Sequence, residues 1–271
     1  MEEQRISLSE TNPDAFMRLR LNMKKEGPRP AVVYFPGGGY HNIHEPSVEP
    51  VADFFRKKGF HVFVVNYSIN EKAAYPAPLL EASRAVWLVR KNAAEWNVDP
   101  ERISLLGMSA GSHLCTALST MWQYEECQMD DMPYGGNRPN AIVTGYTPTI
   151  FADFFEQPPE VLANFKGQGP GNLLGKEGTR WADIHELTTH DLVTKDTCPA
   201  FLWKSTTDFP GDTFAYANAL KREGIPYEVH VFYDEGVNCV GMGKEGASAN
   251  TMMWPELAVN WLYKVLRIEV S

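Results

Sequence analysis

The stretch Ile103-Ser104-Leu105-Leu106-Gly107-Met108-Ser109-Ala110-Gly111 decides the fold of this chain. It begins as a strand-like apolar run and ends in a Gly-x-Ser-x-Gly pentapeptide. Residues 114, 118 and 121 then mark the apolar face of a helix. Strand, sharp turn and helix in this order are the setting in which a serine hydroxyl is exposed as a nucleophile, because small neighbours fit a strained turn. Ser109 is therefore the candidate reactive residue.

Apolar runs of strand length alternate with segments of helical period on both sides of this stretch. The strand-like runs are, in chain order, 31–35, 62–67, 103–106, 141–143, 200–203 and 229–233. Helical spacing recurs between Leu79 and Ala93, and Pro255 opens a terminal helix. This alternation predicts βαβ units, so we expect an α/β fold with a mostly parallel central sheet flanked by helices on both faces.

The length and the loop composition indicate one domain over residues 1–271 with an insertion. From about 124 to 196 the chain is rich in polar residues, Gly, Pro and aromatics, and from about 147 onward it lacks a sustained period. This part is expected to form a cap or insertion over the strand ends. A moving lid and a surface excursion without a gating role explain that composition equally well.

Composition and charge exclude several classes of function. A net charge of -9 works against nucleic acid or an anionic membrane as a partner. The acidic N-terminus and the absence of an 18-residue apolar run predict a cytoplasmic chain that does not cross a membrane. The four cysteines lack C-x-x-C spacing and predict neither a metal site nor a disulfide framework. The oligomeric state has no signal in the sequence.

A second chemical motif follows the first strand-like run of the α/β pattern. Pro36-Gly37-Gly38-Gly39-Tyr40 lets backbone N–H groups turn toward a ligand without a Cβ in the way, as an oxyanion loop requires. A flexible turn is the alternative interpretation. A phosphate-binding loop fits less well, because neither the Lys-Ser/Thr of a P-loop nor Gly-x-Gly-x-x-Gly spacing is present.

The run from Pro30 to Leu114 resembles the esterase and lipase branch of the α/β-hydrolases that has a His-Gly-Gly-Gly-type loop. It is most similar to bacterial acetyl-xylan-esterase-like, xylanase-associated esterases. The resemblance rests on motifs at 35–40, 66–67, 75–78, 97–103 and 107–114, in the family's order. It implies an α/β-hydrolase fold and a serine esterase for small acyl esters, acetylated sugars among them. Such an enzyme forms an acyl-enzyme on its serine, takes a small-molecule ester and needs no cofactor or metal.

The resemblance also implies the roles of particular residues. Ser109 is the expected nucleophile and Asp208 the expected triad acid, with Asp212 as a competitor that fits a helix cap better. The expected oxyanion donors are the amides of Gly38, Gly39 and Ala110. Tyr40 and His41 are expected to line the substrate site.

The third triad position departs from the family pattern. In the family a histidine stands in a Gly-x-His-Gly loop after the last strand, and here Asn238 takes that place. An amide has no basic group that could accept the serine proton near neutral pH. Either His41 or His44 substitutes as the base, or the chain is a degenerate hydrolase that binds an ester or sugar with little turnover. We expect structural roles for His113 and His230, and no motif recommends residues 61, 185 or 190.

Overall fold

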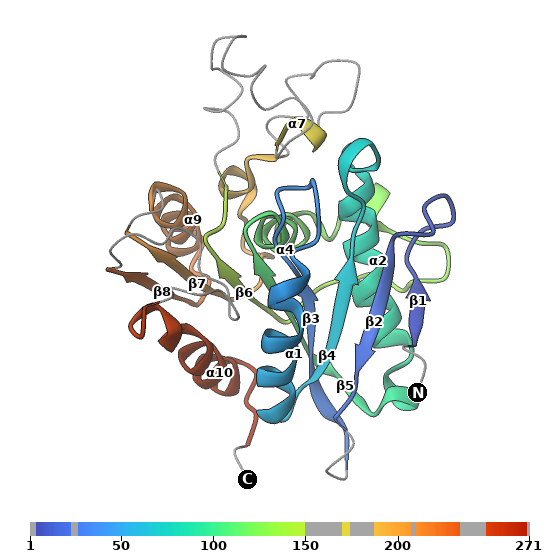
Figure 1. The fold of residues 1–271 in the computed structure, drawn as a ribbon, viewed down its shortest axis with the longest axis horizontal. Helices are drawn as coiled ribbons and strands as arrows, with labels where there is room; N and C mark the ends of the chain where they lie inside the picture. Colours follow the sequence, from blue (N-terminus) through green and yellow to red (C-terminus); the bar gives the residue numbers. More distant parts are fainter. Residues whose placement is uncertain are drawn as a thin grey trace.

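A single sheet of eight strands forms the centre of the molecule. The computed structural model describes residues 4–22, 27–149, 170–173, 187–206, 210–233 and 248–269. The strands lie in the order β1-β2-β4-β3-β5-β6-β7-β8 (Figure 1). They are β1 (Arg5–Ser7), β2 (Phe16–Arg20), β3 (Arg29–Phe35), β4 (His61–Asn66), β5 (Val98–Met108), β6 (Ala141–Gly145), β7 (Ala200–Ser205) and β8 (Tyr227–Phe232). All neighbours from β4 to β8 are parallel, so the expected mostly parallel sheet is confirmed.

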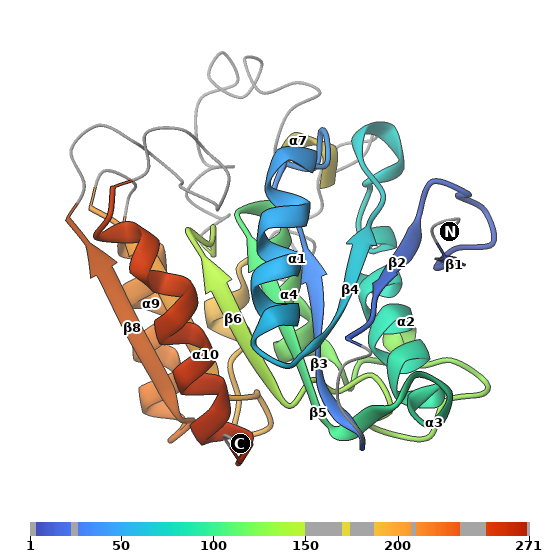
Figure 2. The same cartoon turned by 60° about the horizontal axis from the view of Figure 1, so that its bottom comes forward.

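Helices cover both faces of this sheet, as expected (Figure 2). They are α1 (Val48–Lys57), α2 (Ala77–Lys91), α3 (Ala93–Trp96), α4 (Ala110–Met121), α7 (Pro170–Leu173), α9 (Gly211–Arg222) and α10 (Trp254–Val265). The apolar sides of α2, α4 and α9 share one core cluster, and those of α1 and α10 share the other. The two clusters lie on opposite faces of the sheet because side chains alternate along each strand. In β3, Val33 joins the first cluster and Tyr34 the second.

Two parts of the fold differ from the sequence-based expectation. β1 and β2 form an antiparallel extension of the sheet that the hydrophobic pattern does not reveal. β5 starts at Val98, several residues before the expected strand, because Asn97 adopts a left-handed conformation that ends α3. β6 lies inside the range 124–196, and residues 150–169 and 174–186 are outside the described part, so a lid over the site remains a prediction.

The parallel strands bring the chemical motifs to one edge of the sheet. β3 leads into the glycine loop, β5 leads into Ser109, and β6 ends at Gly145 between β5 and β7. The carboxyl ends of neighbouring parallel strands lie side by side, and open α/β sheets bind their ligands at this edge. Loops that are far apart in the sequence therefore meet around Ser109.

Candidate active site

Ser109 occupies the strained turn that the pentapeptide predicts. It follows the last residue of β5 and precedes the first residue of α4, with φ 52° and ψ -118°. Few residues other than glycine adopt a positive φ, and strain of this kind persists where the surrounding structure enforces it. The side chain is partly exposed, whereas the residues on either side of it are buried. Ser109 is therefore a partly exposed residue in an otherwise buried segment.

The two glycines of the pentapeptide allow the turn to pack against its neighbours. A Cβ added at Gly111 would lie 1.9 Å from the carbonyl oxygen of Phe35. A Cβ added at Gly107 would lie 2.5 Å from the carbonyl oxygen of Gly111. Both distances are far below van der Waals contact, so a larger residue at 111 would push α4 away from β3, and one at 107 would push α4 away from β5. The Gly-x-Ser-x-Gly pattern is thus a packing requirement of the place where strand, turn and helix meet.

The glycine loop lies against the serine turn. A Cβ added at Gly37 would lie 3.0 Å from the carbonyl oxygen of Met108 and 3.4 Å from Cβ of Ser109. Gly38 has φ 146°, and its carbonyl oxygen accepts the backbone N–H groups of His41 and Asn42, both at 3.0 Å. The loop is therefore folded tightly back on itself beside Ser109, and the expected proximity of the two motifs is confirmed.

Three backbone amides near Ser109 are candidates to bind an oxyanion. Within the described part of the chain, no acceptor is recorded for the N–H groups of Gly38, Gly39 or Ala110. Ala110 is the first residue of α4, where the helix dipole adds partial positive charge. Amides of this kind stabilise the negative oxygen of a tetrahedral intermediate if they point at it. Their assignment as oxyanion donors remains a prediction.

Gly145, at the end of β6, fixes the serine turn from the other side. Its carbonyl oxygen accepts the backbone N–H of Ser109 at 3.0 Å and the hydroxyl of Ser112 at 2.9 Å. A Cβ at Gly145 would meet the indole ring of Trp203 at 2.5 Å. No sequence motif singled out Gly145. The only available signal was a glycine two residues beyond the predicted strand 141–143, and glycines in strands often mark a close approach of two backbones.

Tyr40, the last residue of the glycine motif, is built into the core. Its side chain is 2% exposed, and its hydroxyl lies 2.7 Å from Nδ1 of His113 on α4. The amide of Asn172 donates to the Tyr40 carbonyl oxygen at 2.9 Å. Any contribution of the Tyr40 ring to the site therefore acts through support of the loop. His41 lies on the exposed side of the same turn.

His113 has a structural role, as the sequence indicated. Its Nε2 lies 2.9 Å from the carbonyl oxygen of Leu187, which can only accept, so this nitrogen carries the proton and Nδ1 accepts from Tyr40. Complete burial lowers the pKa of His113 to about 4. Both ring nitrogens are occupied, and the ring is neutral near pH 7. It is therefore not the base for Ser109.

The remaining triad candidates fall partly outside the described residues. Asp208 and Asn238 both lie outside them. Asp212 is described: its Oδ1 accepts the backbone N–H of Thr149 at 3.2 Å, and its Oδ2 lies 3.6 Å from Nζ of buried Lys204. These contacts engage both carboxylate oxygens in holding α9 to β7 and to the chain after β6. The structure thus gives Asp212 a structural task.

The other histidines divide by position. His41 and His44 are exposed, and their backbone N–H groups bond to the glycine loop. His61 is engaged by the N–H of Asn22 and the carbonyl of Asn97, far along the chain from the motifs. His230 contacts Glu228 on the outer strand. His41 and His44 therefore remain the substitute bases that the sequence proposed, whereas residue 185 is outside the described part.

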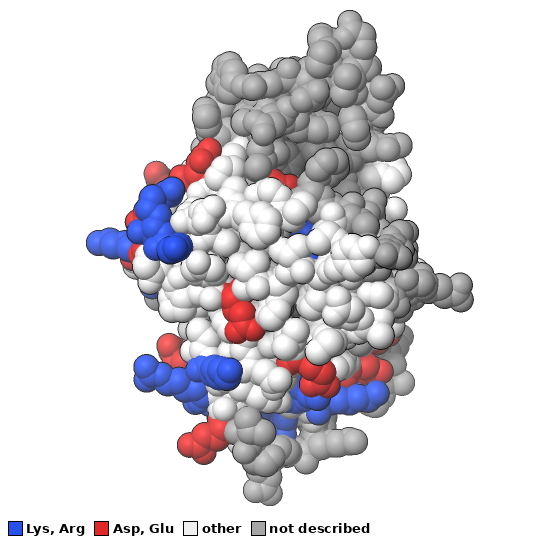
Figure 3. All heavy atoms as spheres, turned by 90° about the vertical axis from the view of Figure 1, so that its left-hand side faces the viewer, with Lys and Arg blue, Asp and Glu red and all other residues white. Residues whose placement is uncertain are grey.

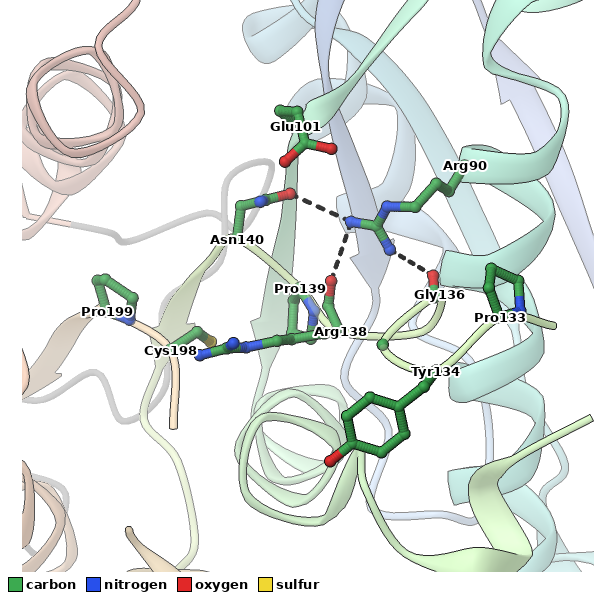
Figure 4. Close-up of a pocket in the computed structure, with 11 residues that line it drawn as sticks. Arg90, Glu101, Pro133, Tyr134, Gly136, Arg138, Pro139, Asn140, Cys198 and Pro199 are labelled. Atoms are coloured by element: carbon green, nitrogen blue, oxygen red, sulfur yellow. Dashed lines mark hydrogen bonds between the residues drawn. The ribbon is translucent and has the colours of Figure 1, made fainter. Parts of the chain in front are cut away.

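A pocket of about 390 Å³ lies at the opposite end of the sheet (Figure 4). It is lined by the segments that enter β6 and β7, including Asn140 and Pro199, whereas Ser109 follows the carboxyl end of β5. Arg90 donates to the carbonyl oxygens of Gly136 and Arg138 and, at 3.2 Å, to the side-chain oxygen of Asn140. The guanidinium therefore ties loops together and is not displayed to a ligand.

Neither a metal site nor a membrane helix is found in the described residues. No group of three His, Cys, Asp or Glu side chains there could hold a metal ion. No described helix is both long and apolar enough to cross a bilayer.

Comparisons with known proteins find relatives of this sequence among esterases and xylanases. The family model described as BD-FAE matches residues 17–210. The acetylxylan esterase of Xylanibacter ruminicola is 37% identical over 164 residues, which cover 58% of this chain and 31% of that protein. The endo-1,4-beta-xylanase B of Butyrivibrio fibrisolvens is 29% identical over 215 residues, covering 75% of this chain and 31% of that protein. The chain thus matches about a third of the length of these curated relatives.

Solved structures match nearly the whole chain. An acetyl ester-xyloside bifunctional hydrolase from Caldicellulosiruptor lactoaceticus superposes with a TM-score of 0.81, 28% identity and 97% coverage of both chains. The carboxylesterase Cest-2923 from Lactobacillus plantarum shares the fold with a TM-score of 0.80, 19% identity and 100% coverage of both chains. The family match covers more than half of the sequence and includes both the glycine loop and Ser109. The chain therefore belongs to the BD-FAE family of α/β-hydrolase esterases.

Proposed function

We propose that the chain hydrolyses short-acyl carboxylic esters, acetylated sugars among them, with Ser109 as the nucleophile. The observation that carries this proposal is the contact between two motifs that the sequence separates by about 70 positions. A Cβ added at Gly37 would lie 3.4 Å from Cβ of Ser109 in its strained turn. The amides of Gly38 and Ala110, for which no acceptor is recorded among the described residues, belong to the same two segments. A nucleophile beside pre-positioned N–H donors is the arrangement that acyl transfer needs.

The proposed reaction has two halves. The Ser109 oxygen attacks the ester carbonyl and gives up its proton, while the amides of Gly38, Gly39 and Ala110 stabilise the negative carbonyl oxygen. The intermediate collapses, the carbon–oxygen bond to the alcohol breaks, and the alcohol leaves with a proton. Water then attacks the acyl-serine, releases the carboxylic acid and restores the Ser109 hydroxyl. A base must hold the proton between these steps.

The substrate class rests on relatives and on composition. One relative is an acetylxylan esterase, and a solved structure of similar fold is an acetyl ester-xyloside hydrolase. The sequence also lacks a long apolar run that would favour binding at a lipid interface. Turnover of acetate and decanoate esters of the same phenol tests the acyl preference. Faster hydrolysis of the decanoate would contradict it.

Asn238 supports a second candidate function, a degenerate hydrolase that binds an ester or sugar with little turnover. An enzyme of this type that lacks its base still accelerates the reaction by roughly 10³- to 10⁴-fold over water, through its oxyanion donors and binding groups. Slow, Ser109-dependent hydrolysis is therefore the expected behaviour of the wild type if no other group replaces the base.

One assay series separates the two functions. Acetate-ester hydrolysis is measured for the wild type, Ser109→Ala and Asn238→His. A slow wild type that is strongly accelerated by Asn238→His identifies a hydrolase that has lost its base. A fast wild type that Asn238→His leaves unchanged points to another base, which His41→Ala and His44→Ala then locate. Full activity in Ser109→Ala would refute the proposed mechanism.

A further inference from the structure

The pocket of about 390 Å³ where the chain enters β6 and β7 has no task in the proposed reaction. Ser109 follows the carboxyl end of β5, so the pocket and the nucleophile lie at opposite ends of the sheet. Pockets that hold small molecules measure roughly 300–1,000 Å³. Figure 4 shows Glu101 and Tyr134 on opposite sides of the Arg90 guanidinium in this pocket. The pocket therefore has the size of a ligand site and a mixed polar and aromatic wall.

Tyr134 gives the pocket an aromatic surface, and its side chain is 77% exposed. It takes the second position of a turn that the N–H of Gly136 closes on the carbonyl oxygen of Pro133, at 2.8 Å. Gly135, at the third position, has φ 81°, as a type II turn requires. The Tyr134 ring also packs against the ring of Trp122, with the centroids 5.3 Å apart. The turn and the indole therefore fix an aromatic ring that remains exposed to solvent.

The turn is anchored to the core of the molecule. The Arg90 guanidinium donates to the carbonyl oxygen of Gly136. The next residue, Asn137, is completely buried, and its side-chain amide donates to the carbonyl oxygens of Trp122 and Cys127 at 2.8 and 3.1 Å. A site that is already formed loses little conformational freedom when a ligand binds, which favours affinity.

The other exposed large apolar side chains of the described residues lie in a different setting. They are Phe214 on α9, Tyr227 on β8, Tyr233 just after β8, and Met253 just before α10. Figure 3 views the molecule from the β8 side, and charged side chains there lie mainly around the periphery of a broad uncharged area. None of these four side chains lines the pocket. Tyr134 therefore differs from them in having hydrogen-bonding groups beside its ring.

Polar groups in the pocket keep hydrogen-bonding capacity for a ligand. Across the described part of the chain, no hydrogen bond is recorded for the hydroxyl of Tyr134 or the carboxylate of Glu101. The side-chain oxygen of Asn140 accepts from Arg90 and from the N–H of Ile103, so its NH2 group stays available as a donor. The pocket thus offers an acceptor at Glu101, a donor at Asn140, and a hydroxyl at Tyr134 that can act as either.

The charges of the pocket oppose both kinds of ion. A cation would meet the guanidinium groups of Arg90 and Arg138, and an anion would meet the carboxylate of Glu101. All three nitrogens of Arg90 already donate to protein oxygens. Arg138 donates to the carbonyl oxygen of Asp196 at 3.0 Å and lies over the ring of Trp122, 5.0 Å from its centroid. A neutral ligand with several hydroxyl groups fits these surroundings better than an ion does.

We propose that this pocket binds a neutral sugar, with a pyranose ring stacked on Tyr134 and its hydroxyl groups bonded to Glu101 and Asn140. A pyranose ring has C–H groups on its faces and hydroxyl groups around its edge. It therefore matches an aromatic face that stands beside both donors and acceptors. Binding here is independent of turnover at Ser109. If the chain acts on acetylated sugars, the pocket also holds the enzyme on a polysaccharide whose esters react at Ser109, and this consequence alone rests on the proposed function.

Titration calorimetry of the full chain with xylotriose tests the binding. Tyr134→Ala should weaken it about tenfold or more, because the ring is the main apolar contact, whereas Tyr134→Phe keeps the ring and should stay within about threefold of the wild type. Tyr227→Ala removes an exposed tyrosine outside the pocket and should bind as the wild type does. Circular dichroism confirms that each variant is folded. A wild type that binds no xylotriose up to about 10 mM, or a folded Tyr134→Ala with wild-type affinity, overturns the proposal.

Glu101→Gln and inorganic phosphate test the chemistry of the ligand. The variant keeps the shape of the side chain and removes the charged acceptor, so it should also weaken xylotriose binding. Phosphate should bind more weakly than xylotriose to the wild type. Phosphate that binds more tightly, and loses this affinity in Arg138→Gln, identifies an anion site and contradicts the proposal.

Hydrolysis of two esters tests the consequence for a polymer. The measured quantity is kcat/KM on acetylated xylan divided by kcat/KM on phenyl acetate, which is too small to reach both sites. A second binding site raises the effective concentration of the polymer, so this ratio should fall about threefold or more in Tyr134→Ala and stay unchanged in Tyr227→Ala. Equal ratios in the wild type and Tyr134→Ala contradict the holding role. A wild type that hydrolyses neither ester refutes the proposed function, whereas the calorimetry alone decides whether the pocket binds a sugar.

Discussion

The hydroxyl of Tyr40 donates a 2.7 Å hydrogen bond to Nδ1 of His113, and this bond joins the glycine loop to α4, the helix that follows Ser109. The other ring nitrogen of His113 donates to the carbonyl of Leu187. All three groups are buried. The imidazole thus connects the loop that contains Gly38 and Gly39 with the helix that begins at Ala110. These three candidate oxyanion donors must surround one oxygen atom, and the bond between Tyr40 and His113 holds the two segments together.

Tyr40→Phe should lower esterase activity more than it lowers stability. Losing the hydroxyl leaves Nδ1 of His113 without its donor, at a cost of about 1–3 kcal/mol in the free energy of unfolding. A small displacement of the glycine loop should reduce kcat for acetate esters roughly tenfold, since catalysis is sensitive to misplacement of less than 1 Å. Denaturant unfolding and steady-state kinetics measure the two effects.

Tyr34→Phe is the matched control for this substitution. Tyr34 is also a buried tyrosine with a hydroxyl partner, Ser47 at 3.3 Å, but its ring lies on the other face of the sheet. It should therefore lose some stability and keep its kcat. If Tyr34→Phe and Tyr40→Phe reduce kcat equally, the bond between Tyr40 and His113 has no special part in the site.

The buried His113 should make folding stability depend on pH below neutrality. Its pKa is about 4 in the folded chain, whereas an unfolded histidine titrates near 6.5. As the pH falls through this window, the unfolded chain binds a proton that the folded chain does not bind. Stability is therefore lost on acidification between about pH 6.5 and 4, by roughly 3 kcal/mol in total.

His113→Gln should remove this part of the pH dependence. Glutamine does not titrate, and its amide can accept from Tyr40 and donate to Leu187. Guanidinium unfolding of both proteins at pH 7.5, 6, 5 and 4.5 gives the comparison. The stability difference between them should change in favour of the variant as the pH falls. Parallel curves for the two proteins would mean that His113 has the same pKa in the folded chain as in the unfolded chain.

Gly111→Ala should prevent folding or cost several kcal/mol, because its Cβ would lie 1.9 Å from the carbonyl oxygen of Phe35. Gly211→Ala is the matched control. Gly211 is exposed at the start of α9, and no atom lies within 4 Å of its added Cβ, so alanine there should be neutral or stabilise by up to about 1 kcal/mol. Thermal unfolding of the two variants distinguishes them. A Gly111→Ala protein with wild-type stability would show that the turn can relax.

The sequence predicts the features that depend on local pattern. β3, β4 and β6 are buried on both faces, so they read as continuous apolar runs. The Ser109 turn is predictable because only small residues fit sterically at 107 and 111, and the Gly-x-Ser-x-Gly motif contains this requirement. The sequence pattern does not predict β1 and β2, because both strands are short and half-exposed. The arginines of β2 also pair with glutamates that come later in the chain.

Contacts between distant segments are the part that the sequence does not predict. Tyr40 and His113 are 73 residues apart, and each belongs to a motif that says nothing of the other. Gly145 holds Ser109 across two strands through a backbone carbonyl, which any residue type could supply. Asp208 and Asp212 are only four positions apart, so spacing hardly separates them. Only the contacts of Asp212 with Thr149 and Lys204 give it a different task.

A double-mutant comparison in the Asn238→His background assigns the triad acid. An orienting carboxylate assists catalysis only when there is an imidazole to orient. Asp208→Asn should therefore change little in the wild type and remove most of the rate gained by Asn238→His.

Asp212→Asn should instead lower stability in both backgrounds, because it takes a charge partner from Lys204, whose side chain is only 3% exposed. The rate per folded molecule should stay unchanged. Measuring kcat for acetate esters beside thermal unfolding separates the two outcomes, and the acid is Asp212 if its substitution alone cancels the gain.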